Sequence, residues 1–163
     1  MATKMGQAPV EESYFRMRRH LGEQLDLPDW PGGVNPGHFG ERHARDAHAL
    51  LRLAYTGGEG QAGDFDPWWQ RLTQDSEYDP ALCFAVWDGD DVIGLAQCWT
   101  SAFIKDFAIH PRHRRRRVGR ALALHVFHAF KRRGAEAVDL KVLAANLAGM
   151  RFYESLGMTV VPD

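Results

Sequence analysis

The chain has 163 residues, of which 45% are hydrophobic and 25% are charged, and its formal net charge is −1. This balance predicts one globular domain, excludes disordered and fibrous proteins, and argues against a surface devoted to nucleic acid. Its apolar runs are shorter than the ~18 residues of a membrane span, residues 1–10 lack the apolar segment of a secretory signal, and two cysteines, Cys83 and Cys98, make no disulfide framework. We therefore expect a cytoplasmic protein with reduced thiols.

The N-terminal part of the chain predicts a helix and then a break. Apolar side chains within residues 11–25 recur at positions that suit an amphipathic helix, namely Phe15, Met17, Leu21 and Leu25. Prolines and glycines within residues 28–33 interrupt the pattern. We therefore divide the chain into a helical N-terminal extension, residues 1–33, which packs on or flanks a domain over residues 34–163.

The domain continues with alternating strand and helix signals. Residues 34–39 are a weak strand, residues 42–55 a helix, and residues 67–73 a short helix with Asp66 as its N-cap. Later strands are expected at 82–87, 92–100, 103–109, 137–143 and 158–161, and helices at 118–133 and 147–156. This order predicts an α/β fold with a mixed central sheet.

An arginine-rich loop lies between the strand at 103–109 and the helix at 118–133. Six of the nine residues from Arg112 to Arg120 are arginine. Free N–H groups of a helix N-terminus and forked arginine donors suit phosphate oxygens, and Gly119 allows a close approach to the backbone. The alternatives are a solvated basic loop or an RNA-binding patch, although the loop has no aromatic residues on which bases stack.

Two segments resemble the GCN5-related N-acetyltransferase (GNAT) superfamily. FAIHPRHRRRRVGRAL, from Phe107 to Leu122, is similar to its cofactor loop, in which a strand and a proline precede R/Q-x-x-G-x-G/A. NLAGMRFYESLGM, from Asn146 to Met158, is similar to its N-x-x-A-x-x-x-Y-x-x-x-G-F segment. In register with Pro111, Arg117 stands at the first glycine of the loop motif. Either the Cβ of Arg117 crowds a bound pyrophosphate, or the Arg117 guanidinium pairs with the pyrophosphate. An alternative alignment starts the motif at Arg116 and places Gly119 at its first glycine.

The resemblance implies that the mixed central sheet is mostly antiparallel and flanked by helices. It also implies an enzyme that uses acetyl-CoA and transfers the acetyl group, by direct attack, to a primary amine of a small molecule or peptide. Main-chain groups of the strand would bind the pantetheine arm, the loop would cradle the pyrophosphate, and Tyr153 would protonate the departing thiolate. The alternatives are a helix N-cap for Asn146 and a core aromatic for Tyr153. The implied cofactor-binding residues are Phe107, Ala108, Ile109, Arg114, Arg115, Arg116, Arg117, Val118, Gly119, Arg120, Asn146 and Tyr153.

The general base stays open, because Lys105 and Lys141 stand where family members carry a glutamate. Asp106 is the nearest carboxylate and the candidate catalytic residue beside Tyr153, although strand alternation puts it on the face opposite Lys105. His110 and a water chain are the alternatives. The two lysines would place positive charge beside the acceptor and favour a substrate that carries a carboxylate or phosphate.

Other residues complete the prediction. Trp99 is a candidate substrate-lining residue, with core packing as the alternative, and no metal site is assigned, since His125 and His128 lack a third ligand nearby. Few residues follow Gly157, so one closing strand of the superfamily's sheet is missing. Either a homodimer, which we expect, or the N-terminal segment would cover that edge. The rival function is a non-catalytic acyl-CoA-binding regulatory domain, and a small RNA-binding domain is third.

Overall fold

The computed structural model describes residues 13–22, 24–55, 62–114 and 116–163. Its strands are β1 (Tyr14–His20), β2 (Val34–His38), β3 (Cys83–Asp88), β4 (Asp91–Trp99), β5 (Phe103–Ile109), β6 (Ala137–Leu143) and β7 (Thr159–Val161). Its α-helices are α1 (Ala44–Ala54), α2 (Phe65–Gln74), α3 (Val118–Arg132) and α4 (Leu147–Ser155). None of the described helices is long and apolar enough to span a membrane.

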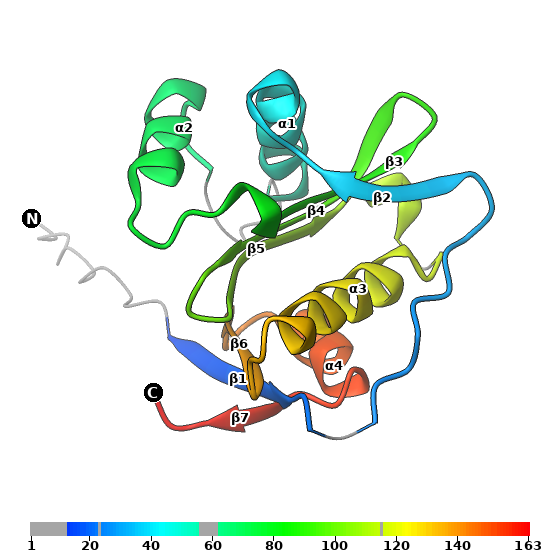
Figure 1. Cartoon of the computed structure of the whole chain (residues 1–163), viewed down its shortest axis with the longest axis vertical. Helices are drawn as coiled ribbons and strands as arrows, with labels where there is room; N and C mark the ends of the chain where they lie inside the picture. The colour runs from blue at the N-terminus through cyan, green and yellow to red at the C-terminus, as the bar shows by residue number, and fades with distance from the viewer. Residues whose placement is uncertain (1–12, 23, 56–61, 115) are drawn as a thin grey trace, which may run out of the picture.

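The strands form one sheet in the order β2-β3-β4-β5-β6-β1-β7, in which only β5 and β6 run parallel to each other. Helices α1 and α2 lie on one side of the sheet, and α3 and α4 lie on the other (Figure 1). The prediction of a mixed, mostly antiparallel sheet flanked by helices is therefore confirmed.

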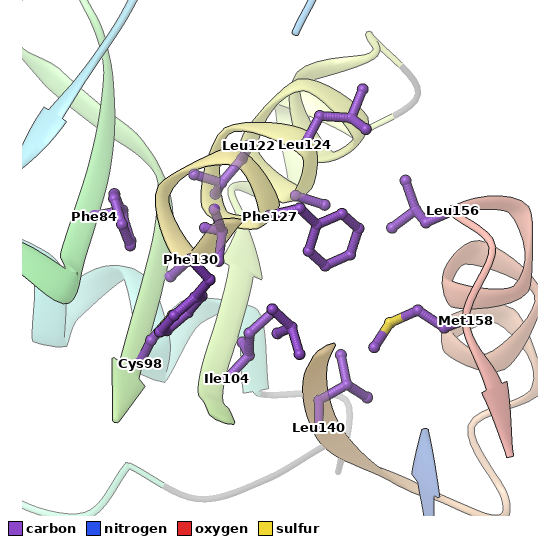
Figure 2. Packing of buried hydrophobic residues seen from close by; sticks show 14 of the residues in the cluster. Phe84, Cys98, Ile104, Leu122, Leu124, Phe127, Phe130, Leu140, Leu156 and Met158 are labelled. Atoms are coloured by element: carbon purple, nitrogen blue, oxygen red, sulfur yellow. The ribbon is translucent and has the colours of Figure 1, made fainter. Parts of the chain in front are cut away.

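The sheet separates two hydrophobic clusters. The first joins α3 to the sheet and to the segment after α4, and Figure 2 shows Phe127 of α3 beside Leu156 and Met158. The second joins α1 and α2 to the opposite face through buried residues such as Leu51, Trp68 and Leu95. Because both faces of β3, β4 and β5 are covered, these strands are the rigid base on which the loops are held.

The expected N-terminal helix is wrong for the part that the structure describes, since Tyr14–His20 form the strand β1. Met17 is fully buried, while Arg16 and Arg18 face the other side and bind Asp139 of β6 at 2.7 Å each. The two-residue alternation of apolar Phe15 and Met17 with arginines is a strand pattern. The more distant leucines had made it resemble a helix.

Strand β1 also fills the gap expected after the last helix. It pairs with β6 on one side and with β7 on the other, both antiparallel. The N-terminal segment therefore supplies a strand to the C-terminal half of the sheet. β7 becomes its short edge, with Val160 half exposed. The homodimer stays a prediction.

Most predicted boundaries agree with the structure, and the start of α2 is an exception. The helix begins at Phe65, and its N-cap is Asp64, whose backbone is extended (φ −79°, ψ 154°), instead of Asp66. Pro67 then occupies the third helical position, where its missing N–H has no partner in the helix to lose. The fixed φ of Pro67 suits the first turn whether the helix starts at residue 65, as observed, or at residue 67, as predicted.

Candidate active site

The arginine loop leads into an N-terminus of α3 that no side chain caps. Arg117 is the N-cap residue, its side chain makes no capping hydrogen bond, and the first backbone bond runs from the N–H of Ala121 to the carbonyl of Arg117 at 3.0 Å. The preceding N–H groups, at residues 118–120, have no acceptor within the helix and carry the positive end of its dipole. This end of α3 is therefore suited to an anion.

Arg117 adopts the conformation that a glycine at its position would favour. Its φ of 61° and ψ of 8° lie in the left-handed region, which costs a residue with a Cβ about 1 kcal/mol. Its side chain is 75% exposed and its Nη1 lies 3.1 Å from Asp29 Oδ2. The loop thus makes the left-handed turn before α3 without a glycine, and the Arg117 guanidinium extends into solvent.

A cavity of about 490 Å³, here named the α3 cavity, lies beside this helix end. β5 pairs with β6 at only Phe103 and Ile104 in the described structure, so the two strands diverge beyond that point. The edge of β5 that faces the gap is therefore available to an extended ligand. The predicted residues lining the cavity are Phe107, Ala108, Ile109, Arg114, Arg117, Gly119, Arg120, Asn146 and Tyr153.

Two glycines allow close packing around the α3 cavity. A Cβ on Gly119 would lie 3.2 Å from Cζ of Phe152, so the glycine lets α3 approach α4. A Cβ on Gly149 would collide with Nδ2 of Asn146. Oδ1 of Asn146 caps α4 by accepting a 2.9 Å hydrogen bond from the Gly149 N–H. Asn146 is therefore the N-cap of α4, and its Nδ2 amino group is the part that can donate to a ligand.

A β-bulge brings Lys105 and Asp106 to the same side of β5, contrary to the prediction from strand alternation. Gln97 and Cys98 of β4 pair with Asp106 and Ile104, so Lys105 is the extra residue. The Lys105 ammonium lies 3.4 Å from Asp106 Oδ2, and both residues line the same two cavities. The regular alternation that we assumed is broken at this residue.

Tyr55, which follows α1, is a site residue that the sequence reasoning missed. Its hydroxyl donates a 2.8 Å hydrogen bond to Oδ1 of Asp106, whose side chain is 14% exposed. Tyr55 and Asp106 lie 51 positions apart, and no local pattern marks such a pair. The bond fixes the carboxylate at the point where β5 leaves β6.

A second cavity of about 510 Å³, here named the splay cavity, lies between β5 and β6. It shares Tyr55, Phe107, Asn146 and Tyr153 with the α3 cavity, so the two adjoin. Lys105 and Lys141 both line it, as predicted from their neighbouring strands. The Lys141 ammonium lies 3.2 Å from Oδ2 of Asp163, and the ring of Tyr14 forms part of the wall.

A third cavity, also of about 510 Å³ and here named the α2 cavity, continues from Lys105 and Asp106 toward α2. Trp99 lines it, and the Lys105 ammonium lies 5.8 Å from the centre of the Trp99 ring. Arg71 of α2 adds a second cation that the sequence reasoning did not select. Together the three cavities form a row from the α3 N-terminus to α2.

Several predicted residues lie outside this row. Val118 is buried in the first hydrophobic cluster, Arg116 is exposed and lines none of these three cavities, and Arg115 falls outside the described residues. His110 lines a different hollow beside the β3–β4 turn. Burial is the main cause that lowers the pKa of His110, and the neighbouring His113 and Arg112 lower it further.

The remaining chemistry-bearing groups are structural. Both cysteines are buried and free, and burial raises the pKa of the Cys83 thiol to about 12. His125 packs against Trp30 and Phe84. Over the described ranges, no three His, Cys, Asp or Glu side chains are grouped to hold a metal ion. The row of cavities therefore offers the fixed carboxylate of Asp106, a second carboxylate at Asp75, three phenols and a set of arginine and lysine cations.

Comparison with known proteins gives a consistent family. Residues 44–158 match the family model of the Acetyltransferase (GNAT) family. The mycothiol acetyltransferase of Thermobispora bispora is 31% identical in an alignment 160 residues long, which covers 89% of this chain and 53% of that protein. The ribosomal protein bS18 alanine N-acetyltransferase of Escherichia coli K12 is 38% identical over 56 residues, or 34% of this chain and 38% of that enzyme. The chain thus spans about half the length of the mycothiol acetyltransferase.

Solved structures agree in fold. A GCN5-related N-acetyltransferase from Sphaerobacter thermophilus superposes with a TM-score of 0.76 at 25% identity, covering 91% of this chain and 48% of that chain. The ribosomal-protein-S18-alanine N-acetyltransferase of Escherichia coli superposes with a TM-score of 0.62 at 21% identity, covering 76% of each chain.

Proposed function

The chain belongs to the Acetyltransferase (GNAT) family, and we propose that it is an acetyl-CoA-dependent N-acetyltransferase that acts on a primary amine of a small molecule or peptide. One observation carries the proposal: four residues join the anion-suited α3 cavity to the carboxylate-bearing splay cavity. A donor and an acceptor that enter from the two sides would meet at Tyr55, Phe107, Asn146 and Tyr153. Because the chain spans about half the length of the mycothiol acetyltransferase, its activity and its acceptor are part of this proposal.

The residues present fit the pyrophosphate and pantetheine parts of acetyl-CoA. Uncapped N–H groups of α3, with the guanidiniums of Arg114, Arg117 and Arg120, would hold the phosphates. The free edge of β5 would pair with the amides of the arm, and Nδ2 of Asn146 would donate to it. When bound, acetyl-CoA supplies an acetyl group activated as a thioester.

The side chains at the junction divide the proton chemistry. Asp106, oriented by the Tyr55 hydroxyl, takes the proton of the incoming ammonium at a carboxylate oxygen. Tyr153 lines both cavities and donates its hydroxyl proton to the departing sulfur. Direct attack by the amine needs no protein nucleophile, in keeping with the burial of both cysteine thiols.

The acceptor would carry an anionic group. In the splay cavity Lys105 and Lys141 outnumber the carboxylate of Asp106, whereas in the α2 cavity Arg71 and Lys105 are matched by Asp75 and Asp106. A carboxylate or phosphate on the acceptor would pair with Lys105 or replace Asp163 at Lys141, whereas a polyamine would be repelled by the two ammonium groups. Spermidine acetylated faster than every anionic amine would contradict this assignment.

Calorimetric titration with acetyl-CoA, followed by thiol release in the presence of anionic and cationic amines, tests the function. We expect micromolar binding and turnover, with turnover by Tyr153→Phe about 100-fold slower. Binding without turnover on any amine would favour the non-catalytic acyl-CoA-binding domain. The absence of binding would remove the proposal, and RNA titration would then test the arginine loop.

A further inference from the structure

The connection from β1 to β2 runs alongside α3 (Figure 1). We name residues 24–33 of this connection the strap. Asp26 Oδ2 lies 2.8 Å from Arg120 Nη2, and Asp29 Oδ2 lies 3.1 Å from Arg117 Nη1. Both arginines line the α3 cavity. Two cations of the anion-suited end thus already have carboxylate partners from the same chain.

The strap is fastened to the core and to α3 on both sides of Asp26. Leu25 is buried in the first hydrophobic cluster, and the carbonyl of Asp26 lies 2.9 Å from Nε2 of His128. The ring of Trp30 makes an edge contact with His125, with 5.8 Å between the centroids. These contacts hold the two carboxylates near the arginines, which raises their effective concentration there.

The ion pairs are nevertheless weak enough for a ligand to displace. The side chains of Asp29 and Arg117 are 80% and 75% exposed, and those of Asp26 and Arg120 are 71% and 41% exposed. Exposed pairs are screened by water and salt. A phosphate group carries more charge than a carboxylate and gains the helix N-terminus as well. A displaced Asp26 or Asp29 carboxylate that remains near the α3 N-terminus repels the bound phosphate.

We propose that Asp26 and Asp29 set the affinity and the charge selectivity of the α3 cavity by competing with a ligand's phosphates for Arg120 and Arg117. The inference rests on the proposed function, because it takes the ligand to be a phosphate-bearing acyl thioester. Breaking the pairs costs the same for every ligand, but repulsion by the carboxylates grows with phosphate charge. Their removal therefore strengthens the binding of more highly charged ligands most.

The test compares the double variant Asp26→Asn/Asp29→Asn with the wild type by calorimetry at low salt. We expect acetyl-CoA to bind about tenfold more tightly, and dephospho-acetyl-CoA, which lacks one phosphate, about threefold more tightly. Inorganic pyrophosphate, used as a second probe, should also bind more tightly, and added salt should narrow every difference. Unchanged affinity for all three ligands would overturn the proposal.

Asp64→Asn/Asp66→Asn is the matched control, because it removes the same charge from two exposed residues of the α2 N-terminus. An equal gain in this control would show a general charge effect and overturn the proposal. If no protein binds acetyl-CoA but the strap variant binds pyrophosphate more tightly than the control, the proposed function fails and the competition stands. If none binds any of the ligands, both fail.

Discussion

The α3 cavity and the splay cavity adjoin each other, yet their side chains come together in different ways. Most of the α3 cavity comes from two short segments, Phe107–Arg120 and Asn146–Ser155. The splay cavity adds Tyr14 of β1 and Lys141 of β6, and it shares Tyr55, which follows α1, with the α3 cavity. A local motif thus makes the anion-suited end, whereas the proposed acceptor end depends on how the sheet is assembled. This difference predicts that the two ends respond to different substitutions.

The largest expected effect separates the two ends. Asp106→Asn keeps the shape of the side chain and removes the proposed base, so we expect turnover to fall about 100-fold or more. Acetyl-CoA affinity should stay unchanged, because Asp106 does not line the α3 cavity. The measurement is thiol release with the best anionic amine, beside calorimetry. A variant that turns over at the wild-type rate would remove Asp106 from the mechanism and leave water as the base.

The second prediction concerns the assembly of the acceptor end. Asp139→Asn leaves Arg16 and Arg18 without the carboxylate that joins β1 to β6, and we expect the free energy of unfolding to fall by about 3 kcal/mol. Urea denaturation measures this. Asp163→Asn, at an exposed carboxylate that also contacts Arg16, is the control and should cost under about 0.5 kcal/mol. Equal effects would mean that the partly buried contacts of Asp139 with Arg16 and Arg18 do not stabilise the pairing of β1 with β6.

The same residue predicts a pH dependence. Burial alone raises the pKa of Asp139, but hydrogen bonds from Arg18 and Arg16 outweigh it and hold the pKa below its ordinary value. The charged form is therefore the one that folding favours. Its contribution is full above the unfolded pKa of about 3.9 and is lost as the pH falls through the lower folded pKa. The stability difference between wild type and Asp139→Asn should shrink in that acidic range.

The next prediction concerns Asn146, one of the four residues that line both the α3 cavity and the splay cavity. Gly149→Ala places a Cβ 2.4 Å from Nδ2 of Asn146, so Asn146 must turn away and α4 loses its N-cap. We expect a loss of stability of about 1 kcal/mol and weaker binding of acetyl-CoA. Ala148→Gly, one residue earlier in the same turn, is the control for helix propensity. Unchanged acetyl-CoA affinity would show that the orientation of Asn146 does not matter to the ligand.

The smallest effect is expected at the anion-suited end. Arg117→Gly relieves the left-handed backbone at φ 61° and should stabilise the fold by up to about 1 kcal/mol. It also removes a cation that lines the α3 cavity, so acetyl-CoA should bind a few-fold more weakly. Thermal unfolding and calorimetry measure the two changes. Tighter binding by the variant would mean that the Arg117 side chain obstructs the ligand.

The site could be predicted as far as its residues are neighbours in sequence. The strand Phe103–Ile109, the helix that starts at Val118 and the cap at Asn146 agree with the prediction. Tyr55 could not be found, because its partner Asp106 lies 51 positions away. The strap was missed for the same reason, since Asp26 and Asp29 lie far along the chain from Arg120 and Arg117.

The sequence by itself determined the elements of the domain core and the anion-suited turn, because periodicity, caps and a loop motif act over a few residues. Only the tertiary structure decided that residues 14–20 are a strand, since pairing with β6 and burial of Met17 override a mixed apolar pattern. It also decided the side on which Lys105 lies, because the bulge depends on the register against β4. Contacts between distant segments set these features, and no local preference encodes them.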